Sequence, residues 1–129
     1  MKISLTPEES ERFFHNALCN GLSYFRGYGL VLDYDKEPYQ KAKQDLTKDN
    51  KSACFEDVLM RMLANGGELR VIDEECDGDY NRTIKIADVH EKVQNSPIDA
   101  LMDMANEQDD ACTADCILQT VFFDEVIFG

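Results

Sequence analysis

The sequence predicts an α+β fold in which about six helices pack on a small sheet of about three strands. Apolar residues recur at helical spacing in most segments, which indicates helices that each bury one face. Two short alternating segments near residues 68-86 flank Asp77-Gly78, a pair typical of the turn in a β-hairpin. The 129 residues contain no linker-like tract, so residues 1-129 are expected to form a single compact domain.

The first helix has the clearest start signal in the chain. Thr6 can cap it, Pro7 suits its first position, and Glu9 completes a capping box. The helix is expected to continue to about Arg26. Its buried stripe recurs every three or four residues and consists of Phe14, Leu18, Leu22 and Phe25.

The remaining elements follow from helical or alternating apolar spacing and from their boundary residues. In chain order they are a strand over residues 28-34, a helix over 35-46, a loop over 47-51, a helix from Ser52 to about residue 64, strands over 68-75 and 82-86, a helix that Asp88 caps, a helix over 97-105 that Ser96 caps, and a helix from Asp109 or Thr113 past Gln119. The sequence does not decide whether residues 120-128 form a helix or a strand, because several of them favour β structure.

The helix over 97-105 is expected to bury one apolar face in the core. The residues assigned to that face are Ile98, Leu101, Met102 and Ala105. This assignment leaves the acidic residues of the helix on its solvent side.

The net charge of −13 arises entirely from the second part of the chain. Residues 1-51 carry eight basic and eight acidic residues, whereas residues 52-129 carry five basic and eighteen acidic ones. No Lys or Arg follows Lys92. Such a charge repels nucleic-acid phosphates, so direct binding to nucleic acid is not expected, and a basic protein surface is the complementary partner. Solubility alone is the other explanation of this charge.

The first functional hypothesis is therefore a non-enzymatic interaction protein that binds a basic surface of another protein, as a DNA-mimicking inhibitor does. Charge attraction would speed the encounter, and neighbouring apolar residues would supply most of the affinity. The acids expected to contact the partner are Asp77, Asp79, Asp99, Asp103, Glu107, Asp109 and Asp110. A further alternative is a homo-oligomeric structural component that associates through Val121 to Phe128.

The alternative to an interaction protein is a metal-binding domain or a metal-dependent enzyme. His15 and Cys19 lie four residues apart in the first helix, and Cys112 and Cys116 do so in the last. Each pair therefore shares a helix face, and two facing helices could complete a tetrahedral zinc site. None of these spacings is a zinc knuckle, however, and cysteines on an apolar helix face commonly belong to the core, as is also expected of Cys54.

The acidic run from Asp73 to Asp79 has the density of a calcium-binding loop. The twelfth position counted from Asp73 is Ile84, where an EF-hand requires glutamate, so the sequence leaves only a weak divalent-ion site or a solvated turn. The chain also lacks a glycine-rich phosphate loop, a nucleophile elbow and a His-Glu-x-x-His motif. An enzyme is therefore the less favoured interpretation.

Cysteine usage and hydropathy indicate the compartment. Five cysteines at irregular spacing suit a reducing environment. The N-terminus lacks a long apolar signal region, and no apolar run approaches the roughly 20 residues that span a bilayer. These features predict a cytoplasmic protein that does not bind membranes.

Four segments resemble a known group of proteins. They are Phe14-His15-Asn16-Ala17-Leu18, Cys54-Phe55-Glu56-Asp57-Val58-Leu59-Met60, Ile86-Ala87-Asp88-Val89-His90 and Thr113-Ala114-Asp115-Cys116-Ile117-Leu118-Gln119. In these segments the chain is similar to small, uncharacterised acidic proteins of phages and mobile elements of gut Bacteroidales. The resemblance covers most of the chain and implies a viral or mobile-element context, in which such proteins often bind a host protein. It carries over no catalytic or binding residue.

Overall fold

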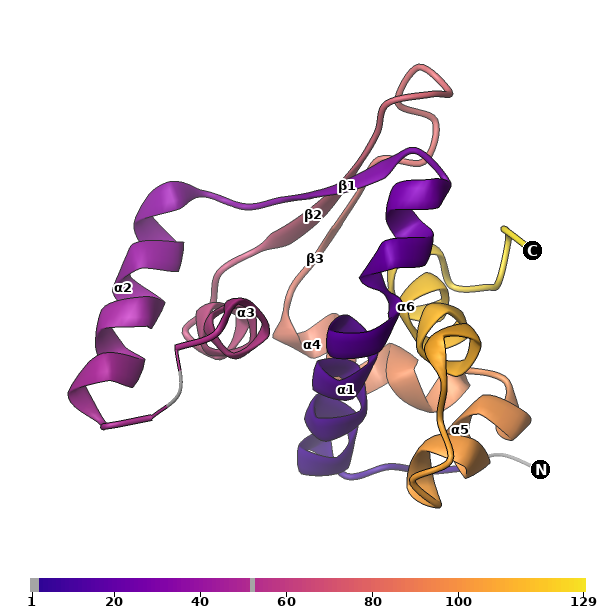
Figure 1. The fold of residues 1–129 in the computed structure, drawn as a ribbon, viewed down its shortest axis with the longest axis horizontal. Coiled ribbons are helices and arrows are strands. Elements are labelled where there is room, and N and C mark those ends of the chain that lie inside the picture. The colour runs from indigo at the N-terminus through magenta and orange to yellow at the C-terminus, as the bar shows by residue number, and fades with distance from the viewer. Residues whose placement is uncertain (1–2, 52) are drawn as a thin grey trace.

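The elements lie in the order that the sequence predicts, and the computed structural model, which describes residues 3-51 and 53-129, confirms the α+β class (Figure 1). In chain order they are α1 (Pro7–Gly27), β1 (Leu30–Asp33), α2 (Lys36–Lys48), α3 (Phe55–Ala64), β2 (Leu69–Asp73), β3 (Arg82–Ile84), α4 (Ile86–Lys92), the 3-10 helix η1 (Val93–Asn95), α5 (Ile98–Ala105) and α6 (Ala111–Phe123).

The three strands form one antiparallel sheet in the order β1-β2-β3. Leu30 is paired with Asp73, and Leu69 with Ile84, so the predicted hairpin is confirmed. The sheet buries one face, which includes Leu69 and Ile84, whereas Val31 on the opposite face is 43% exposed. Figure 1 shows α2 and α3 beyond one end of the strands and the α1–α6 pair beside the other. An antiparallel sheet can leave one face exposed to solvent, as the face with Val31 is here.

Two helices from opposite ends of the chain, α1 and α6, pack side by side (Figure 1). They approach closely at Gly21, where an added β-carbon would lie 3.0 Å from the backbone and side chain of Ala114. Aromatic rings fill the interface on either side of this point: the ring centroid of Phe122 lies 6.4 Å from that of Phe14 and 5.8 Å from that of Phe25. Three residues of the predicted stripe of α1, Phe14, Leu18 and Phe25, are therefore confirmed as core, whereas Leu22 is only half-buried at its edge.

A buried polar network connects α6 to Tyr28, which follows α1, and to the C-terminal residues 127 and 128. The Tyr28 hydroxyl donates to Asp115 Oδ2 at 2.7 Å, and Gln119 Nε2 donates to the same oxygen at 2.9 Å. Gln119 is fully buried, and its Oε1 accepts from the backbone N–H groups of Ile127 and Phe128, both at 2.8 Å. One glutamine side chain thus fixes the last residues of the chain against α6.

The C-terminal residues form no strand within the described part of the chain. The helix α6 continues to Phe123 and ends at Asp124, whose φ of 67° lies in the left-handed region. Residues 126-128 belong to no helix or strand. Gln119 satisfies the backbone groups that a sheet would otherwise satisfy, which explains why these β-favouring residues need no strand partner.

Several boundaries differ from those predicted. The capping motif of α1 is confirmed, since Thr6 Oγ1 accepts from Glu9 N at 3.1 Å and Glu9 Oε1 accepts from Thr6 N at 2.9 Å. By contrast, α4 begins at Ile86, and Asp88 is its third residue rather than its cap, with a carboxylate that accepts from Lys85 N at 2.9 Å. Ile86 is accordingly helical and not part of a strand.

The start of α5 and two other boundaries were also predicted wrongly. The helix α5 begins after Pro97, and the buried Ser96 hydroxyl has no hydrogen-bond partner among the described residues, so Ser96 does not cap it. The helix α2 extends to Lys48, two residues into the predicted loop. Ser52, the predicted start of α3, lies outside the described residues, and α3 begins at Phe55.

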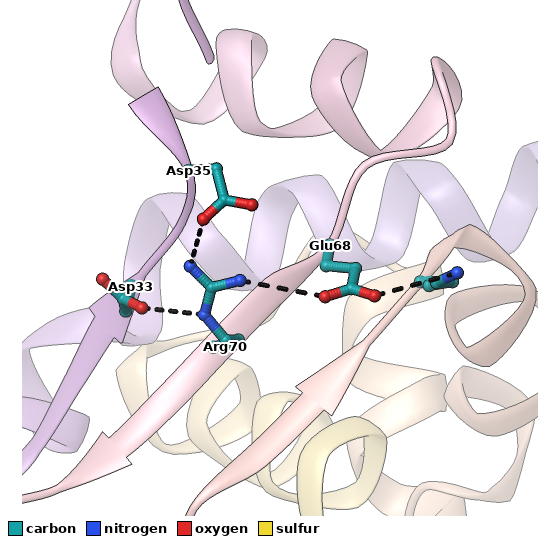
Figure 2. A network of polar contacts seen from close by, with 5 residues as sticks. Asp33, Asp35, Glu68 and Arg70 are labelled. Carbon is teal, nitrogen blue, oxygen red and sulfur yellow. Dashed lines mark hydrogen bonds and ion pairs between the residues drawn. The ribbon is translucent and has the colours of Figure 1, made fainter. Parts of the chain in front are cut away.

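Arg70 of β2 ties the sheet to the start of α2 (Figure 2). Its Nε lies 2.7 Å from Asp33 Oδ2, and its Nη2 lies 2.9 Å from Asp35 Oδ1. Its Nη1 lies 3.8 Å from Glu68 Oε2, which is a looser ion pair. Asp33 is also the cross-strand partner of Arg70, so the ion pairs reinforce the register of β1 against β2. This guanidinium group is thereby neutralised within the chain.

The close contact of α1 with α6 predicts opposite effects for two glycines of α1. Gly21→Ala should lower the free energy of unfolding by about 1–3 kcal/mol, because the new methyl group overpacks the interface with Ala114. Gly27→Ala, whose β-carbon would meet nothing within 4 Å, should leave stability unchanged or raise it by up to about 1 kcal/mol. Urea denaturation measures both, and equal effects of the two substitutions would contradict the proposed packing.

The buried Asp115 predicts a pH dependence of stability. Burial raises the pKa of Asp115 above its ordinary value of 3.8, although the hydrogen bonds from Tyr28 and Gln119 oppose this shift. The folded chain therefore holds this proton more tightly than the unfolded chain, and the stabilising contribution is lost as pH rises through the folded-state pKa.

Comparison with Asp115→Asn, which does not titrate, isolates this effect. The free energy of unfolding of the natural chain should fall relative to that of the variant as pH rises from the ordinary pKa of 3.8 through the raised pKa of Asp115 in the folded chain. A difference that is constant, or that changes in the other direction, would show that the carboxyl group is not destabilised by burial.

Candidate functional site

The seven acids proposed to bind a partner fall into two groups at opposite ends of the molecule. Five lie on α5 and in the segment between α5 and α6, whereas Asp77 and Asp79 lie in the turn between β2 and β3. Figure 1 places that turn at the top of the view and α5 at the bottom. The seven residues therefore do not form a single patch, and the larger group lies on α5 and in the segment that follows it.

The helix α5 turns a different face to the core from the one predicted. Its buried residues are Ala100, Leu101 and Met104, whereas Ile98 is 45% and Met102 51% exposed. The helix carries two overlapping apolar stripes, and only one of them can face α6. Of the predicted face only Leu101 is buried, because the packing against α6 selects the stripe with Ala100 and Met104, and Ala105 is exposed as well.

The exposed stripe lies directly beside acidic side chains. Ile98 and Met102 are one helical turn apart, as are Asp99 and Asp103, so the four side chains alternate along one exposed surface of α5. We call these four residues the α5 outer face. Among the described residues, no ion pair or hydrogen bond engages the carboxylate of Asp99 or Asp103.

Glu107 follows α5 in a backbone conformation that glutamate rarely adopts. Its φ of 56° lies in the left-handed region, at a position after a helix where glycine or asparagine is preferred. Unlike aspartate, glutamate has no short side chain that stabilises this conformation locally. Glu107 is exposed, and it adopts this conformation just after α5 at a cost of about 1 kcal/mol.

The last two acids of this group have local structural roles. Asp110 caps α6, since its Oδ1 accepts from Thr113 N at 2.9 Å, and this backbone hydrogen bond lowers the pKa of Asp110 below its ordinary value. Asp109 Oδ2 accepts from Asn20 Nδ2 at 3.4 Å and so contacts α1. The sequence anticipated the position of Asp110 at a helix start but not the contact with Asn20.

Asp73 organises the β2–β3 turn from within. Its Oδ1 accepts from Cys76 N at 2.9 Å and Glu75 N at 3.0 Å, and its Oδ2 accepts from Tyr80 N at 3.2 Å. These backbone hydrogen bonds, that from Cys76 foremost, lower the pKa of Asp73. Asp77 and Asp79 point to solvent from this turn. The carboxylate that would begin a calcium loop is thus engaged by the turn's own backbone.

The cysteine and histidine pairs lie in different surroundings. His15 Nε2 lies 2.7 Å from Asp57 Oδ1, and the Cys54 thiol donates to Asp57 Oδ2 at 3.0 Å, so α1 and α3 meet there through a polar cluster. Cys54 is exposed, contrary to the prediction that it belongs to the core. The sequence signal for this cluster was the spacing of Cys54 and Asp57, which brings both to the start of α3.

The other pair, Cys112 and Cys116, lies on α6, where Cys112 Sγ is 3.3 Å from the Tyr24 hydroxyl. Burial raises the pKa of both Cys19 and Cys116 above the ordinary value for a thiol. Over residues 3-51 and 53-129, no three His, Cys, Asp or Glu side chains gather closely enough to hold a metal ion.

The proposed oligomerisation segment is largely engaged within the chain. Val121, Phe122 and Phe123 are buried in the core, and Phe128 is half-buried with its ring stacked on Tyr28 at a centroid distance of 4.7 Å. Val126, at 41% exposed, is the large apolar side chain that this segment presents to solvent.

Comparison with protein-family models, with curated proteins and with solved structures finds no match to the chain. Its functional interpretation therefore depends on the residues themselves. In the part of the chain that the structure describes, no helix has both the length and the apolar character needed to cross a membrane.

The two faces of α5 predict a sharp contrast in stability. Leu101→Ala should lower the free energy of unfolding by about 2–5 kcal/mol, because it removes buried contacts with the core. Ile98→Ser and Met102→Ser should each change it by no more than about 0.5 kcal/mol, because both side chains are largely in water already. Chemical denaturation measures these changes, and a large loss for Met102→Ser would restore the face predicted from the sequence.

Proposed function

We propose that this protein is a non-enzymatic interaction protein whose α5 outer face binds a basic surface of another protein. The observation that carries the proposal is the pairing of exposed Ile98 and Met102 with the unpaired carboxylates of Asp99 and Asp103. Two large apolar side chains exposed one turn apart beside unpaired acids are the combination that interaction surfaces commonly present.

The apolar and the acidic side chains of the α5 outer face would make different contributions to binding. Burying each of Ile98 and Met102 against a partner contributes roughly 1 kcal/mol, given that about half of each is already covered. The carboxylates would add attraction at a distance and select for lysine and arginine on the partner. Glu107, exposed two residues beyond the end of α5, would add a further carboxylate near this helix.

The basic residues of the chain do not compete for these acids. Lys92, the last base in the sequence, lies 3.1 Å from Asp124 and 3.8 Å from Asp88. Arg70 is likewise surrounded by acids of its own sheet. The carboxylates of α5 are therefore available to a partner's cations.

A partner that normally binds nucleic acid would present a suitable basic surface. The proposal accordingly includes inhibition by DNA mimicry, in which the acids occupy positions that phosphates otherwise take. It also retains the phage or mobile-element context that the sequence resemblance implies, with a host protein as the target. A duplex competitor would then displace this protein from its partner.

Four versions of the chain test the proposal in affinity capture from host lysate. They are the natural sequence, Asp99→Asn with Asp103→Asn, Ile98→Ser with Met102→Ser, and Asp77→Asn with Asp79→Asn as the control. The control removes the same charge from the β2–β3 turn at the far end of the molecule. The partner should be retained by the natural chain and the control and lost with both α5 variants, and mass spectrometry would identify it.

Binding of the purified partner then gives the magnitudes. The α5 aspartate variant should bind at least about ten-fold more weakly than the natural chain, and the control less than about two-fold more weakly. Affinity of the natural chain should fall as salt is raised. Equal losses for the two aspartate variants would mean that net charge alone matters, and an affinity that is independent of salt would contradict the acidic contact.

A further inference from the structure

A separate apolar pocket lies between α1, β1 and the start of α3. It has a volume of about 200 Å³ and is partly open to solvent. Its apolar walls come from all three elements, with Leu22 and Phe25 from α1, Leu30 and Leu32 from β1, and Phe55 from α3. Figure 1 shows α3 to the left of α1 and α5 to its right, so the pocket is separate from the α5 outer face.

The side chains around the pocket are only partly covered by the core. Leu22 and Phe25 lie three residues apart and share one face of α1, and Leu30 and Leu32 share one face of β1. Phe25 and Leu30 are each 2% exposed, whereas Leu22 and Leu32 are half-buried and pack against the core. Apolar surface therefore remains in contact with water here, and an apolar group that filled the pocket would remove it from water.

Packed aromatic rings hold one wall of the pocket in place. The ring centroid of Tyr34 lies 5.9 Å from that of Phe55 and 4.9 Å from that of Tyr39, on which it stacks. Tyr34 and Phe55 line the pocket, and the ring of Tyr39 in α2 also lies 6.2 Å from that of Phe55. Because these rings already pack on one another, the wall needs little ordering when a ligand binds, which favours affinity.

A positive charge stands at the rim of the pocket. Arg26 lies in the last turn of α1, is exposed, and lines the pocket. Among the described residues, it is the only charged side chain that does so. In the part of the chain that the structure describes, no hydrogen bond or ion pair engages its guanidinium group, in contrast to that of Arg70. An available cation beside an apolar cavity favours a ligand that is both anionic and apolar.

From this combination we infer that the pocket binds a small carboxylic acid whose apolar body is about the size of one aromatic ring. An apolar cavity of about 150 Å³ is large enough for benzene, so a volume of about 200 Å³ accommodates a ring with a short side chain. The ring would lie against Leu22, Leu32 and Phe55, and the carboxylate would accept hydrogen bonds from Arg26.

A protein segment fits the pocket less well than a small molecule does. Leu30 is 2% exposed, so its backbone groups are covered, and a segment laid along β1 would find few hydrogen-bond partners. Of the large apolar side chains exposed in the described residues, Val31 alone lines the pocket. The apolar surface is therefore confined to the cavity and does not extend into the broader patch that a protein interface buries.

Titration of the isotopically labelled full chain with 3-phenylpropionate tests the inference. Amide resonances of Leu22, Arg26, Leu32 and Phe55 should shift together, with a dissociation constant below about 1 mM. The uncharged 3-phenylpropionamide, which has the same ring and chain, should bind at least about five-fold more weakly. Acetate, which has the charge without the ring, should cause no shifts at these residues. Absence of shifts with 3-phenylpropionate at millimolar concentration, or equal binding of the acid and the amide, would overturn the inference.

Two pairs of variants separate the charge from the cavity. Arg26→Gln should remove the preference for the acid over the amide, whereas Arg12→Gln, an exposed substitution near the other end of α1, should keep it. Leu22→Trp should fill the pocket and abolish binding of both ligands, whereas Ser23→Trp, at the exposed neighbouring position outside the pocket, should not. The amide spectrum of each variant without ligand shows whether the fold is retained. A preference for the acid that persists in Arg26→Gln, or equal effects of the two tryptophan variants in folded chains, would contradict the assigned site.

Discussion

The close contact of α1 with α6 is the interaction on which the rest of the structure depends. Gly21 lets the first and last helices approach until a single added methyl group would collide with Ala114. At that distance the rings of Phe25 and Phe122 meet, and the Tyr28 hydroxyl reaches Asp115. In the sequence every other element lies between α1 and α6, so the contact of these two helices brings the first and last elements of the fold together.

This contact also determines which surfaces remain for binding. Gln119 projects from α6 and holds residues 127 and 128 by their backbone, so the apolar C-terminal segment is used inside the molecule. The helix α5 follows η1 and precedes α6 in the sequence, and it is only eight residues long. It can bury just one of its two apolar stripes on α6, and the other stripe, with Ile98 and Met102, stays in water beside the acids.

Local sequence patterns predicted the elements whose signals are local. The capping box of Thr6 and Glu9 and the stripe of α1 depend on residues within one or two turns. The capping box is confirmed, and so is the stripe except for the half-buried Leu22. The buried face of α5 could not be predicted in this way, because both stripes satisfy helical spacing and contact with a distant helix decides between them. The role of Gln119 was equally hidden, since a polar residue on an apolar helix gives no indication of its backbone partners.

The same distinction applies to the candidate site. The excess of acids in the second part of the chain was visible in the sequence, and so was the lack of bases after Lys92. The separation of Asp77 and Asp79 from α5 was not, because it depends on the direction in which the β2–β3 turn projects. The exposure of Ile98 and Met102 was not predicted either, because the sequence pattern assigned both side chains to the core.

Hydrogen exchange at the C-terminus tests the central claim most directly, namely that α6 and its buried glutamine fix the end of the chain to the core. The amides of Ile127 and Phe128 lie in no helix or strand, yet they donate to Gln119 at 2.8 Å. They should therefore exchange far more slowly than the amides of Glu125 and Val126, and as slowly as those of α6. Exchange of all four amides at the same rapid rate would contradict this arrangement, because the C-terminal segment would then be free to leave the core.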